Sequence, residues 1–371
     1  MINKYLNNYK HKKFLFILLY NLINYNLLMF ETSKKRKQKK RYYKKASKFR
    51  YIYKDKLKPK NILCKKKFYL LLFLFILYFS IFFNKIKIIN KKETKICICT
   101  LAKQENLYVR EYLEHYKKYG VNKIYLYDNN DINGEKFEDV ISDYIKSGFV
   151  EIPNWRGRKR IQLKILNECY NNHKDEYDWI MFSEIDEFIH LYNNYTKVST
   201  FLNEPKFNNC EVVHLNLVCH SDNEQLYYEN RPVKERFPNF VPSSMIGGRR
   251  LEIKFILRGH LNNTHISCLH RGNAKLKDCD GFGRAGKYKS IFTKEPDYTY
   301  YYYDHYYGKS TEEFAKKVKR GDGLYPEEQF QRGRIKKYFE ENKLTMEKVL
   351  IIENITRLNL FKYKNKLKHF S

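Results

Sequence analysis

The chain has 371 residues, of which 72 are Lys or Arg and 41 are Asp or Glu, so its formal net charge is +31 at pH 7. Residues 1–90 hold 24 basic and 2 acidic side chains, a net of +22, which leaves 48 basic and 39 acidic side chains, a net of +9, for residues 91–371. The basicity therefore belongs mostly to the N-terminal region. The remainder has the composition of an ordinary globular domain, which argues against a nucleic-acid-binding body.

The most apolar stretch near the N-terminus is Phe68–Phe83, 16 residues without a charge, Gly or Pro. As a helix this stretch is about 24 Å long, somewhat less than a hydrocarbon core of about 30 Å. Extending it to Ile89, with Lys85 and Lys87 reaching the interface, closes the gap. The sequence therefore predicts a transmembrane helix over 68–89, after an N-terminal region 1–67 and before a folded domain 91–371.

A second apolar run, 14–30, is interrupted by three Asn residues, so it is either another span, an interfacial helix or an uncleaved signal-like segment. The intervening Lys34–Lys67 is strongly basic, and by the positive-inside rule it stays cytosolic. This topology predicts a type II signal anchor that places residues 91–371 in the lumen of the Golgi or the endoplasmic reticulum. The rival interpretation of the basic segment is a nucleic-acid-binding arm; we expect a membrane partner and no nucleic acid.

After residue 91 the apolar pattern alternates between strands and helices. The expected strands are Ile96–Leu101, Lys123–Tyr127, Phe149–Ile152 and Trp179–Ser183. The expected helices between them are Leu107–Tyr119, about Glu135–Lys146 and Gly157–Asn172. Strict alternation of this kind predicts an α/β fold with a parallel, doubly wound sheet.

Beyond residue 188 the pattern loosens. Val212–Val218 and Leu251–Leu257 are expected to extend the sheet as a mixed sheet, and Tyr298–Tyr307 is unusually aromatic. A capping box, Ser310–Glu313, opens a basic helix that runs to Arg320. Two more helices are expected to close the chain.

The fourth strand ends in three acids, within Trp179–Phe188. On an extended backbone Glu184 and Asp186 project from one face, while Glu187 points to the other. Two carboxylates on one side repel each other unless a cation lies between them, and oxygen ligands suit Mg²⁺ or Mn²⁺. Because ligands bind at the carboxyl ends of strands in open α/β sheets, this turn is the candidate site. The alternative is a strand followed by a solvated acidic turn.

Seven cysteines follow the predicted membrane span, and their spacing matches no metal site. In an oxidising lumen some of them are expected to pair, and an odd number leaves at least one unpaired. The sequons that begin at Asn194, Asn262 and Asn354 fit a lumenal glycoprotein.

At this point the residues resemble a known family. The matching blocks are Ala102–Asn106 with Glu111–Tyr116 and Tyr127–Asn129, Asp178–Phe188, Pro232–Phe237, and His305–Phe314 with Lys317 and Arg320. Together they resemble the family 92 glycosyltransferases and the related family 2-like group. The resemblance implies a GT-A fold and transfer of a sugar from a nucleoside diphosphate donor, most simply a UDP-sugar, to a glycan or glycoconjugate hydroxyl. It also implies inversion at the anomeric carbon.

The resemblance also implies roles for individual residues. Asp186 binds Mn²⁺ or Mg²⁺, Glu184 stands where the family has Asp, and His305 completes the metal site, with His270 in reserve. The expected nucleotide-sugar contacts are Thr100, Glu105, Asp128, Arg156, Arg158, Lys309 and Arg320. Asp222 is the expected catalytic base, and Glu224 and Glu235 are the alternatives.

Two other functions remain open at this stage. A nucleotidyl- or phosphotransferase also uses acids to hold metal and phosphate, but the sequence has no Walker-type loop. The Glu at position 184 keeps open a non-catalytic, membrane-anchored protein that binds a glycan or another protein.

Overall fold

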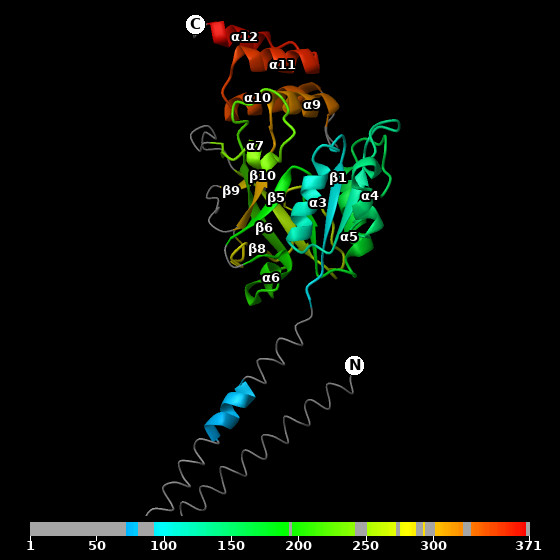
Figure 1. Cartoon of the computed structure of the whole chain (residues 1–371), viewed down its shortest axis with the longest axis vertical. Helices are drawn as coiled ribbons and strands as arrows, with labels where there is room; N and C mark the ends of the chain where they lie inside the picture. Colours follow the sequence, from blue (N-terminus) through cyan, green and yellow to red (C-terminus); the bar gives the residue numbers. More distant parts are fainter. Residues whose placement is uncertain are drawn as a thin grey trace, which may run out of the picture. The chain divides into compact units, whose positions relative to one another are not determined.

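The computed structural model describes residues 72–80, 93–192, 195–241, 251–271, 275–286, 292–293, 301–321 and 328–368 (Figure 1). The chain divides into two compact units, residues 1–91 and 92–371. In the first unit residues 72–80 are helical. Among the described residues no helix has the length and hydropathy to cross a bilayer. The segment 14–30 and the rest of the span predicted for 68–89 lie outside the described residues, so both stay predictions.

The second unit is built on a mixed sheet whose first half is parallel. The parallel strands are β1 (Ile96–Ala102), β2 (Lys123–Asp128), β3 (Val150–Glu151) and β4 (Trp179–Phe182), in the spatial order β3-β2-β1-β4. The helices between them are α3 (Val109–Lys118), α4 (Glu138–Lys146) and α5 (Gln162–His173). The predicted alternation is therefore confirmed, with ends displaced by a few residues.

Side chains of β1 alternate between two cores, as a period of two requires. Ile96 and Ile98 belong to the core that contains residues of α3 and α4, whereas Cys97 and Cys99 belong to the core that contains residues of α5. Figure 1 shows α3 and α4 near β1, in the parallel half of the sheet. The parallel half is thus covered on both faces, which explains why its strands are apolar throughout.

The second half of the sheet continues from β4 in the order β4-β7-β6-β10-β5. Its strands are β5 (Glu187–Leu191), β6 (Val212–Cys219), β7 (Leu251–Arg258) and β10 (Tyr301–His305), with β8 (Asp278–Asp280) on β6 and β9 (Phe292–Thr293) on β7. Only β6–β10 and β6–β8 pair in parallel here. The short helices α6 (Val198–Leu202) and α7 (Val233–Arg236) connect these strands. The mixed extension expected from the sequence is confirmed.

This order has one consequence for the acidic segment. The chain leaves β4 in the middle of the sheet and enters β5, the last strand of the sheet. Residues 183–186 therefore form a turn at the end of the sheet where the parallel strands have their carboxyl ends. The amide of Glu187 donates to the carbonyl of Glu184 at 3.0 Å. The expectation of a continuous extended backbone through Asp186 is therefore wrong, because the strand ends at Phe182.

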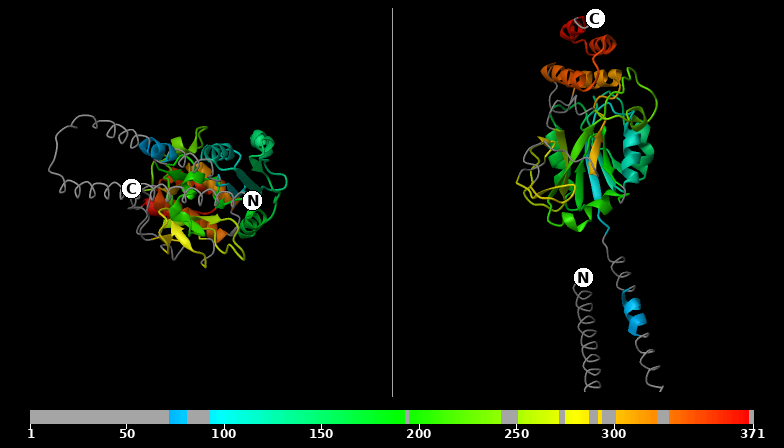
Figure 2. Two further views of the ribbon diagram at one scale, coloured as in Figure 1. Left: turned by 90° about the horizontal axis from the view of Figure 1, so that it is seen from below. Right: turned by 90° about the vertical axis from the view of Figure 1, so that its left-hand side faces the viewer.

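Four helices close the chain at one end of the second unit (Figures 1 and 2). They are α9 (Thr311–Arg320), α10 (Glu328–Glu341), α11 (Met346–Thr356) and α12 (Phe361–Lys368), so three helices rather than two follow the basic one. The capping box is present, since Ser310 accepts from the amide of Glu313 and the Glu313 carboxylate accepts from the amide of Ser310. These helices share a separate core that includes Phe314, Tyr338 and Ile352.

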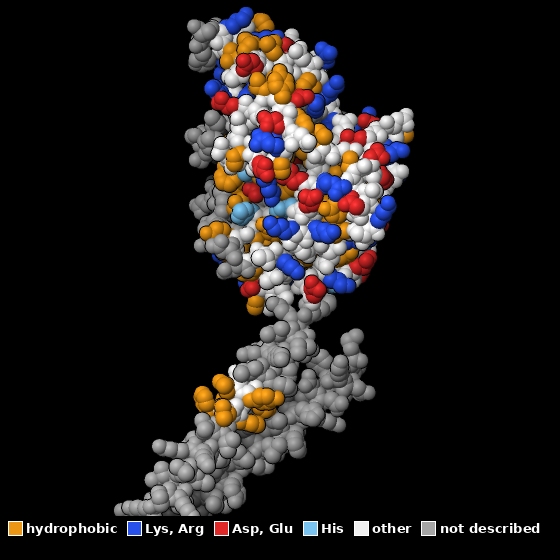
Figure 3. All heavy atoms as spheres, in the orientation of Figure 1, with side chains coloured by type: hydrophobic (Ala, Val, Ile, Leu, Met, Phe, Trp, Pro, Cys, Tyr) orange, Lys and Arg blue, Asp and Glu red, His pale blue; other side chains and the backbone are white. Residues whose placement is uncertain are grey.

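The face of the second unit seen in Figure 3 carries acidic and basic side chains interspersed, without a broad area of one sign. Apolar side chains are exposed on the C-terminal helices, among them Phe330, Met346, Leu350 and Phe361.

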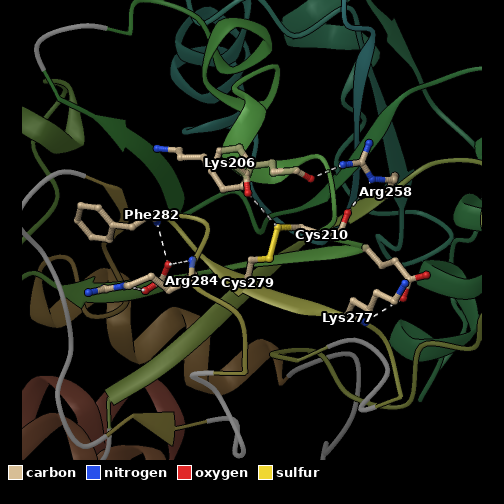
Figure 4. Close-up of a disulfide and its surroundings, with 10 residues drawn as sticks. Lys206, Cys210, Arg258, Lys277, Cys279, Phe282 and Arg284 are labelled. Carbon is tan, nitrogen blue, oxygen red and sulfur yellow. Dashed lines mark hydrogen bonds and ion pairs between the residues drawn. A yellow bond between two sulfur atoms is a disulfide. The ribbon is translucent and has the colours of Figure 1, made fainter.

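Two disulfides join distant parts of the second unit. Cys99 of β1 pairs with Cys169 of α5, and Cys210 pairs with Cys279 of β8. Figure 4 shows the second bond, where the Arg258 side chain donates to the carbonyls of Cys210 and Phe207 at 2.7 and 2.6 Å. The described cysteines Cys97, Cys219 and Cys268 are unpaired. The expectation that some cysteines pair and at least one does not is confirmed.

Replacing Cys210 and Cys279 together by Ser should destabilise the protein. The bond closes a loop across a sequence separation of 69, and constraints of this size typically contribute about 2–4 kcal/mol. Denaturant unfolding should show this loss, while the Cys268→Ser variant, which breaks no disulfide, should unfold like the native chain. Equal stability of the double variant and the native chain would contradict the disulfide.

Candidate active site

The acidic turn is neutralised by a lysine from a neighbouring strand. Lys254 Nζ lies 2.9 Å from Glu184 Oε1 and 3.0 Å from Glu187 Oε1. Side chains of Lys254 and Glu187 are only 3% and 1% exposed, whereas that of Glu184 is 39% exposed. Glu187 also accepts from the amide of Glu184 at 3.0 Å, which closes the turn. The cation between these two carboxylates is therefore an ammonium group.

Strand pairing places Lys254 at this point. β4 and β7 are antiparallel with Met181 opposite Ile256, so the residue two positions before Ile256 lies beside the end of β4. Sequence reasoning missed Lys254, although its strand, Leu251–Arg258, carries Glu252 and Lys254 at alternate positions before the apolar run Phe255–Leu257. These two charges on one face of a strand were the available indication.

The shared ammonium group affects the two glutamates differently. Burial acts to raise the pKa of Glu184, but the charges of Lys254 and Lys317 outweigh it and hold this pKa at about 2. For Glu187, complete burial dominates and raises the pKa despite Lys254. Burial disfavours the Lys254 ammonium, yet its two carboxylate partners raise its pKa. Lys254 and Glu184 are thus both charged at neutral pH.

Asp186 is held by groups from β10 and α9. Lys317 Nζ is 2.5 Å from Asp186 Oδ2, and His305 Nε2 is 3.8 Å from the same oxygen. Burial would raise the pKa of Asp186, but Lys317, His305 and Lys309 together bring it well below its usual value. Burial lowers the pKa of His305 to about 4, so its imidazole is neutral at pH 7.

The three residues expected to bind a metal therefore divide into two groups. Asp186 and His305 lie close enough to share one ion after a small adjustment, and a neutral imidazole with a carboxylate suits Mn²⁺ or Zn²⁺. Glu184 is turned to Lys254 instead. Among the residues that the structure describes, no three His, Cys, Asp or Glu side chains form a metal-binding group. Within the described part of the chain Asp186 and His305 are thus the two candidate ligands, and a bound diphosphate and water would have to complete the shell.

The loop after β1 is joined to α9 by a second ion pair. Arg320 donates to Glu105 Oε1 at 2.5 Å and also to the carbonyls of Lys103 and Gln104. Lys309 Nζ lies 4.0 Å from Glu105 Oε2 and 4.0 Å from the centre of the Tyr108 ring. Three of the expected nucleotide-sugar contacts are therefore gathered beside Asp186, where they face one another.

The expected contacts after β2 have a different arrangement. Arg156 Nε donates to Asp128 Oδ2 at 2.7 Å, and its guanidinium also donates to the carbonyls of Asp131 and Ile132. Arg158 is exposed and lies over the Trp155 ring, 4.4 Å from its centre. Arg156 therefore organises the loop after β2, and its guanidinium donates to this loop rather than being left open for the nucleotide-sugar contact expected for it.

Thr100 lies at the carboxyl end of β1 in the lining of a small pocket. This pocket is lined by Cys99, Thr100, Leu101, Gln162, Leu166, Phe182, Ser183, Glu184, Lys254 and Leu269. Thr100 is thus near Glu184 and Lys254, as expected of a residue that belongs to the same edge of the sheet. His270, the spare metal ligand, has its Nδ1 3.2 Å from the carbonyl of Ile253.

Asp222 does not have the surroundings of a base that meets an acceptor. Its Oδ2 accepts from Tyr338 at 2.6 Å and from Lys348 at 2.5 Å, and its side chain is 3% exposed. Asn342 accepts from its backbone amide at 2.8 Å. Asp222 therefore fastens the loop after β6 to α10 and α11, so the base role expected for it is not supported. Glu224 is exposed and paired with Lys343, and Glu235 is exposed.

The fold and the site define an α/β domain in which acidic and basic side chains form ion pairs at the edge where the parallel strands end. The chain belongs to glycosyltransferase family 92, whose family model matches residues 92–346. This range covers the whole sheet, the acidic turn, α9 and α10.

Three plant proteins of the same family are similar to parts of the chain. They come from Oryza sativa subsp. japonica (27% identical over 108 residues, 29% of this chain and 18% of that protein), Ricinus communis (25% over 133 residues, 36% and 23%) and Arabidopsis thaliana (31% over 112 residues, 28% and 19%). The chain thus matches only about a fifth of the length of these relatives.

Among solved structures, S. aureus TarS 1–349 in complex with UDP-GlcNAc is 14% identical, covering 71% of this chain and 79% of TarS, with a TM-score of 0.34. The same TarS fragment in complex with UDP gives a TM-score of 0.27 over 37% of this chain. Both similarities are too low to carry an argument.

Lys254→Met should be strongly destabilising. It leaves Glu187 buried without its partner, so the pKa of Glu187, already raised by burial, rises further and folding has to bind a proton, a loss of about 3–5 kcal/mol. Adding Glu187→Gln should recover at least about 1 kcal/mol, because Gln is neutral without taking up that proton. Denaturant unfolding measures both, with Lys316→Met, which removes an exposed ion pair to Glu312, as the control. No recovery in the double variant would contradict the shared-ammonium arrangement.

Asp222→Asn should reduce stability rather than catalysis. The change leaves the Lys348 ammonium buried without an opposite charge, again a loss of about 3–5 kcal/mol. Lys348→Met in the same chain should restore part of that loss. At a temperature where each variant is folded, the rate of donor hydrolysis should stay within threefold of the native rate. A hundredfold lower rate at unchanged stability would restore Asp222 as the base.

Proposed function

We propose that residues 92–346 form the catalytic domain of a GT-A-type glycosyltransferase that uses a nucleoside diphosphate sugar. The observation that carries this proposal is the position of Asp186. It lies at the carboxyl edge of the parallel strands, between the ammonium group of Lys317 and the imidazole of His305. In open α/β sheets that edge is where ligands bind, and membership of family 92 gives the reaction class.

The chemistry of sugar transfer explains the basic groups around Asp186. The bond between the anomeric carbon and the diphosphate breaks, and its electron pair stays with the leaving diphosphate. Positive groups placed beforehand near that oxygen stabilise the developing charge. Lys317, Lys309 and Arg320 supply such groups from α9 and the loop before it. Their carboxylate partners, Asp186 and Glu105, keep these cations in place before the donor binds.

A divalent cation, Mn²⁺ or Mg²⁺, is part of this proposal. Asp186 and His305 are the two residues that would hold it, and it would act as a Lewis acid on the diphosphate. In this arrangement Lys317 gives up its contact with Asp186 Oδ2 and turns to the phosphate oxygens. Glu184 acts indirectly, since its carboxylate fixes Lys254 and so the shape of the turn.

The remaining features of the proposal are a uridine diphosphate sugar as donor, a glycan or glycoconjugate hydroxyl as acceptor, and inversion of the anomeric carbon. A lumenal location behind an N-terminal anchor is supported by the two disulfides, which persist in oxidising compartments. The sequon at Asn262 lies on an exposed turn, which is accessible to glycosylation.

A second candidate is a non-catalytic member of the family that binds a glycan. It is favoured by one observation: Lys254 and Lys317 already occupy all three acids of the turn. In such a protein the lysines would be permanent replacements for the metal.

Donor hydrolysis by the full chain in detergent micelles distinguishes these candidates. We expect Mn²⁺-dependent release of nucleoside diphosphate from one member of a panel of UDP-galactose, UDP-N-acetylglucosamine, UDP-glucose and GDP-fucose. Asp186→Asn should lower the rate at least about 100-fold, because it weakens both the metal and the placement of Lys317. The matched control is Asp143→Asn, which alters an exposed pair with Arg110.

Release that persists in EDTA but is lost in Asp186→Asn would show that lysines rather than a metal stabilise the leaving group. No release from any donor, together with no Mn²⁺-dependent donor binding by calorimetry, would contradict the transferase and leave the glycan-binding protein.

A further inference from the structure

Glu252 is an acidic side chain at the same edge of the sheet that the reaction described above does not use. It precedes Lys254 by two residues on β7, so both side chains project from one face of the sheet. Lys254 reaches the acidic turn from that face. Glu252 lies two residues beyond Lys254, nearer to the end of the sheet at which β4 ends and the acidic turn begins.

The pairing of β7, β6 and β10 relates Glu252 to His305. Asn216 lies opposite Ile253, and continuing this antiparallel register puts Leu217 beside Glu252. Leu217 is also opposite Tyr303 of β10, two residues before His305. Glu252 and His305 therefore project from the same face on strands two positions apart, roughly 10 Å between strand axes. The strand between them, β6, carries the buried Leu217 on that face, so Glu252 and His305 lie on either side of an apolar side chain.

The carboxylate of Glu252 is available in a way that the neighbouring ones are not. Its closest described partner is Lys337 of α10, at 3.7 Å, and its side chain is 28% exposed. That distance is too long for a hydrogen bond, so the ammonium group provides charge without occupying the carboxylate oxygens. Burial acts to raise the pKa of Glu252, but Lys337, His270 and His305 lower it below its usual value. The side chain is thus a carboxylate at neutral pH.

Most other acids that the structure describes around this edge are bound at short distance by basic groups. These acids, with their partners, are Glu184 and Glu187 (Lys254), Asp186 (Lys317), Glu105 (Arg320), Asp128 (Arg156) and Asp222 (Lys348). Glu341 shares Lys337 with Glu252, at 4.0 Å, but its side chain is only 11% exposed. Glu184 is charged and more exposed than Glu252, but one of its oxygens accepts from Lys254, whereas Lys337 lies beyond hydrogen-bond distance of Glu252. Glu252 thus combines charge, partial exposure and oxygens that Lys337 leaves open, as a proton acceptor needs.

We propose that Glu252 is the general base that takes the proton of the acceptor hydroxyl. This role rests on the proposed transferase function. The acceptor oxygen forms a bond to the anomeric carbon as the bond from that carbon to the diphosphate oxygen breaks. The hydroxyl proton passes to the Glu252 carboxylate and later to solvent, and the electron pair leaves with the diphosphate beside Lys317. Lys337 is a positioning residue that keeps Glu252 ionised.

Single substitutions in the full chain test this role, with water as the acceptor and the sugar nucleotide that the native chain hydrolyses fastest as the donor. Glu252→Gln preserves size and removes the base, so the rate of nucleoside diphosphate release should fall about 100-fold or more. Mn²⁺-dependent donor binding, measured by calorimetry, and the unfolding midpoint should stay unchanged. Glu229→Gln, an exposed acid paired with Arg231, is the matched control and should keep the native rate.

A second variant separates a base from a structural group. Glu252→Ala should be as slow as Glu252→Gln. Added sodium formate should raise the rate of Glu252→Ala at least tenfold, because a free carboxylate can replace the missing one. A Glu252→Gln rate within threefold of native would overturn the base role while leaving the transferase intact. Loss of donor binding or of folding in Glu252→Gln, with no rescue of Glu252→Ala by formate, would also overturn it. Absence of hydrolysis in the native chain would instead overturn the transferase on which the role depends.

Discussion

Three carboxylates within four residues have to be neutralised at the edge of the sheet, and the rest of the domain is arranged around this requirement. Asp186 and Glu187 are almost completely buried, and an unpaired buried carboxylate is far too costly to persist. Their partners lie far along the chain: Lys254 is 70 residues from Glu184, and Lys317 is 131 residues from Asp186. The acidic turn therefore needs β7 on one side and α9 on the other before it is stable.

This charge balance links folding to the proposed chemistry. The ammonium group of Lys317, which compensates Asp186 in the free protein, is also the group best placed to meet a leaving diphosphate. When a metal and a donor bind at Asp186 and His305, the metal would replace Lys317 as the partner of Asp186, and the diphosphate would replace Asp186 as the partner of Lys317. No buried charge would then be left without an opposite charge. Lys254 has no such alternative partner, since it serves Glu184 and Glu187 together, and its role is to hold the turn.

The same physics explains why residues nominated for binding or catalysis are already held in ion pairs. Arg156 with Asp128, Arg320 with Glu105 and Lys348 with Asp222 are all pairs in which at least one side chain is nearly buried. A charge buried near a ligand site is stabilised first by a protein partner of opposite sign. Glu252 is the contrast, because its partner Lys337 stays at 3.7 Å and part of its side chain remains exposed.

The sequence by itself determined the alternation of strands and helices from Ile96 to Phe182, the capped helix at Ser310 and the location of the acidic turn. These features follow from local patterns, because the spacing of apolar residues, the turn residues and the helix caps each act over a few positions of the chain. Only the tertiary structure decided which cation each acid meets, because Lys254 and Lys317 reach the turn through strand order and helix docking. The same long-range pairing removed Asp222 from the site by joining it to α10 and α11, and placed Glu252 at the edge. Contacts between residues so far apart in the chain leave no periodic trace in the sequence, which is why the fold was predictable and the partners of its acids were not.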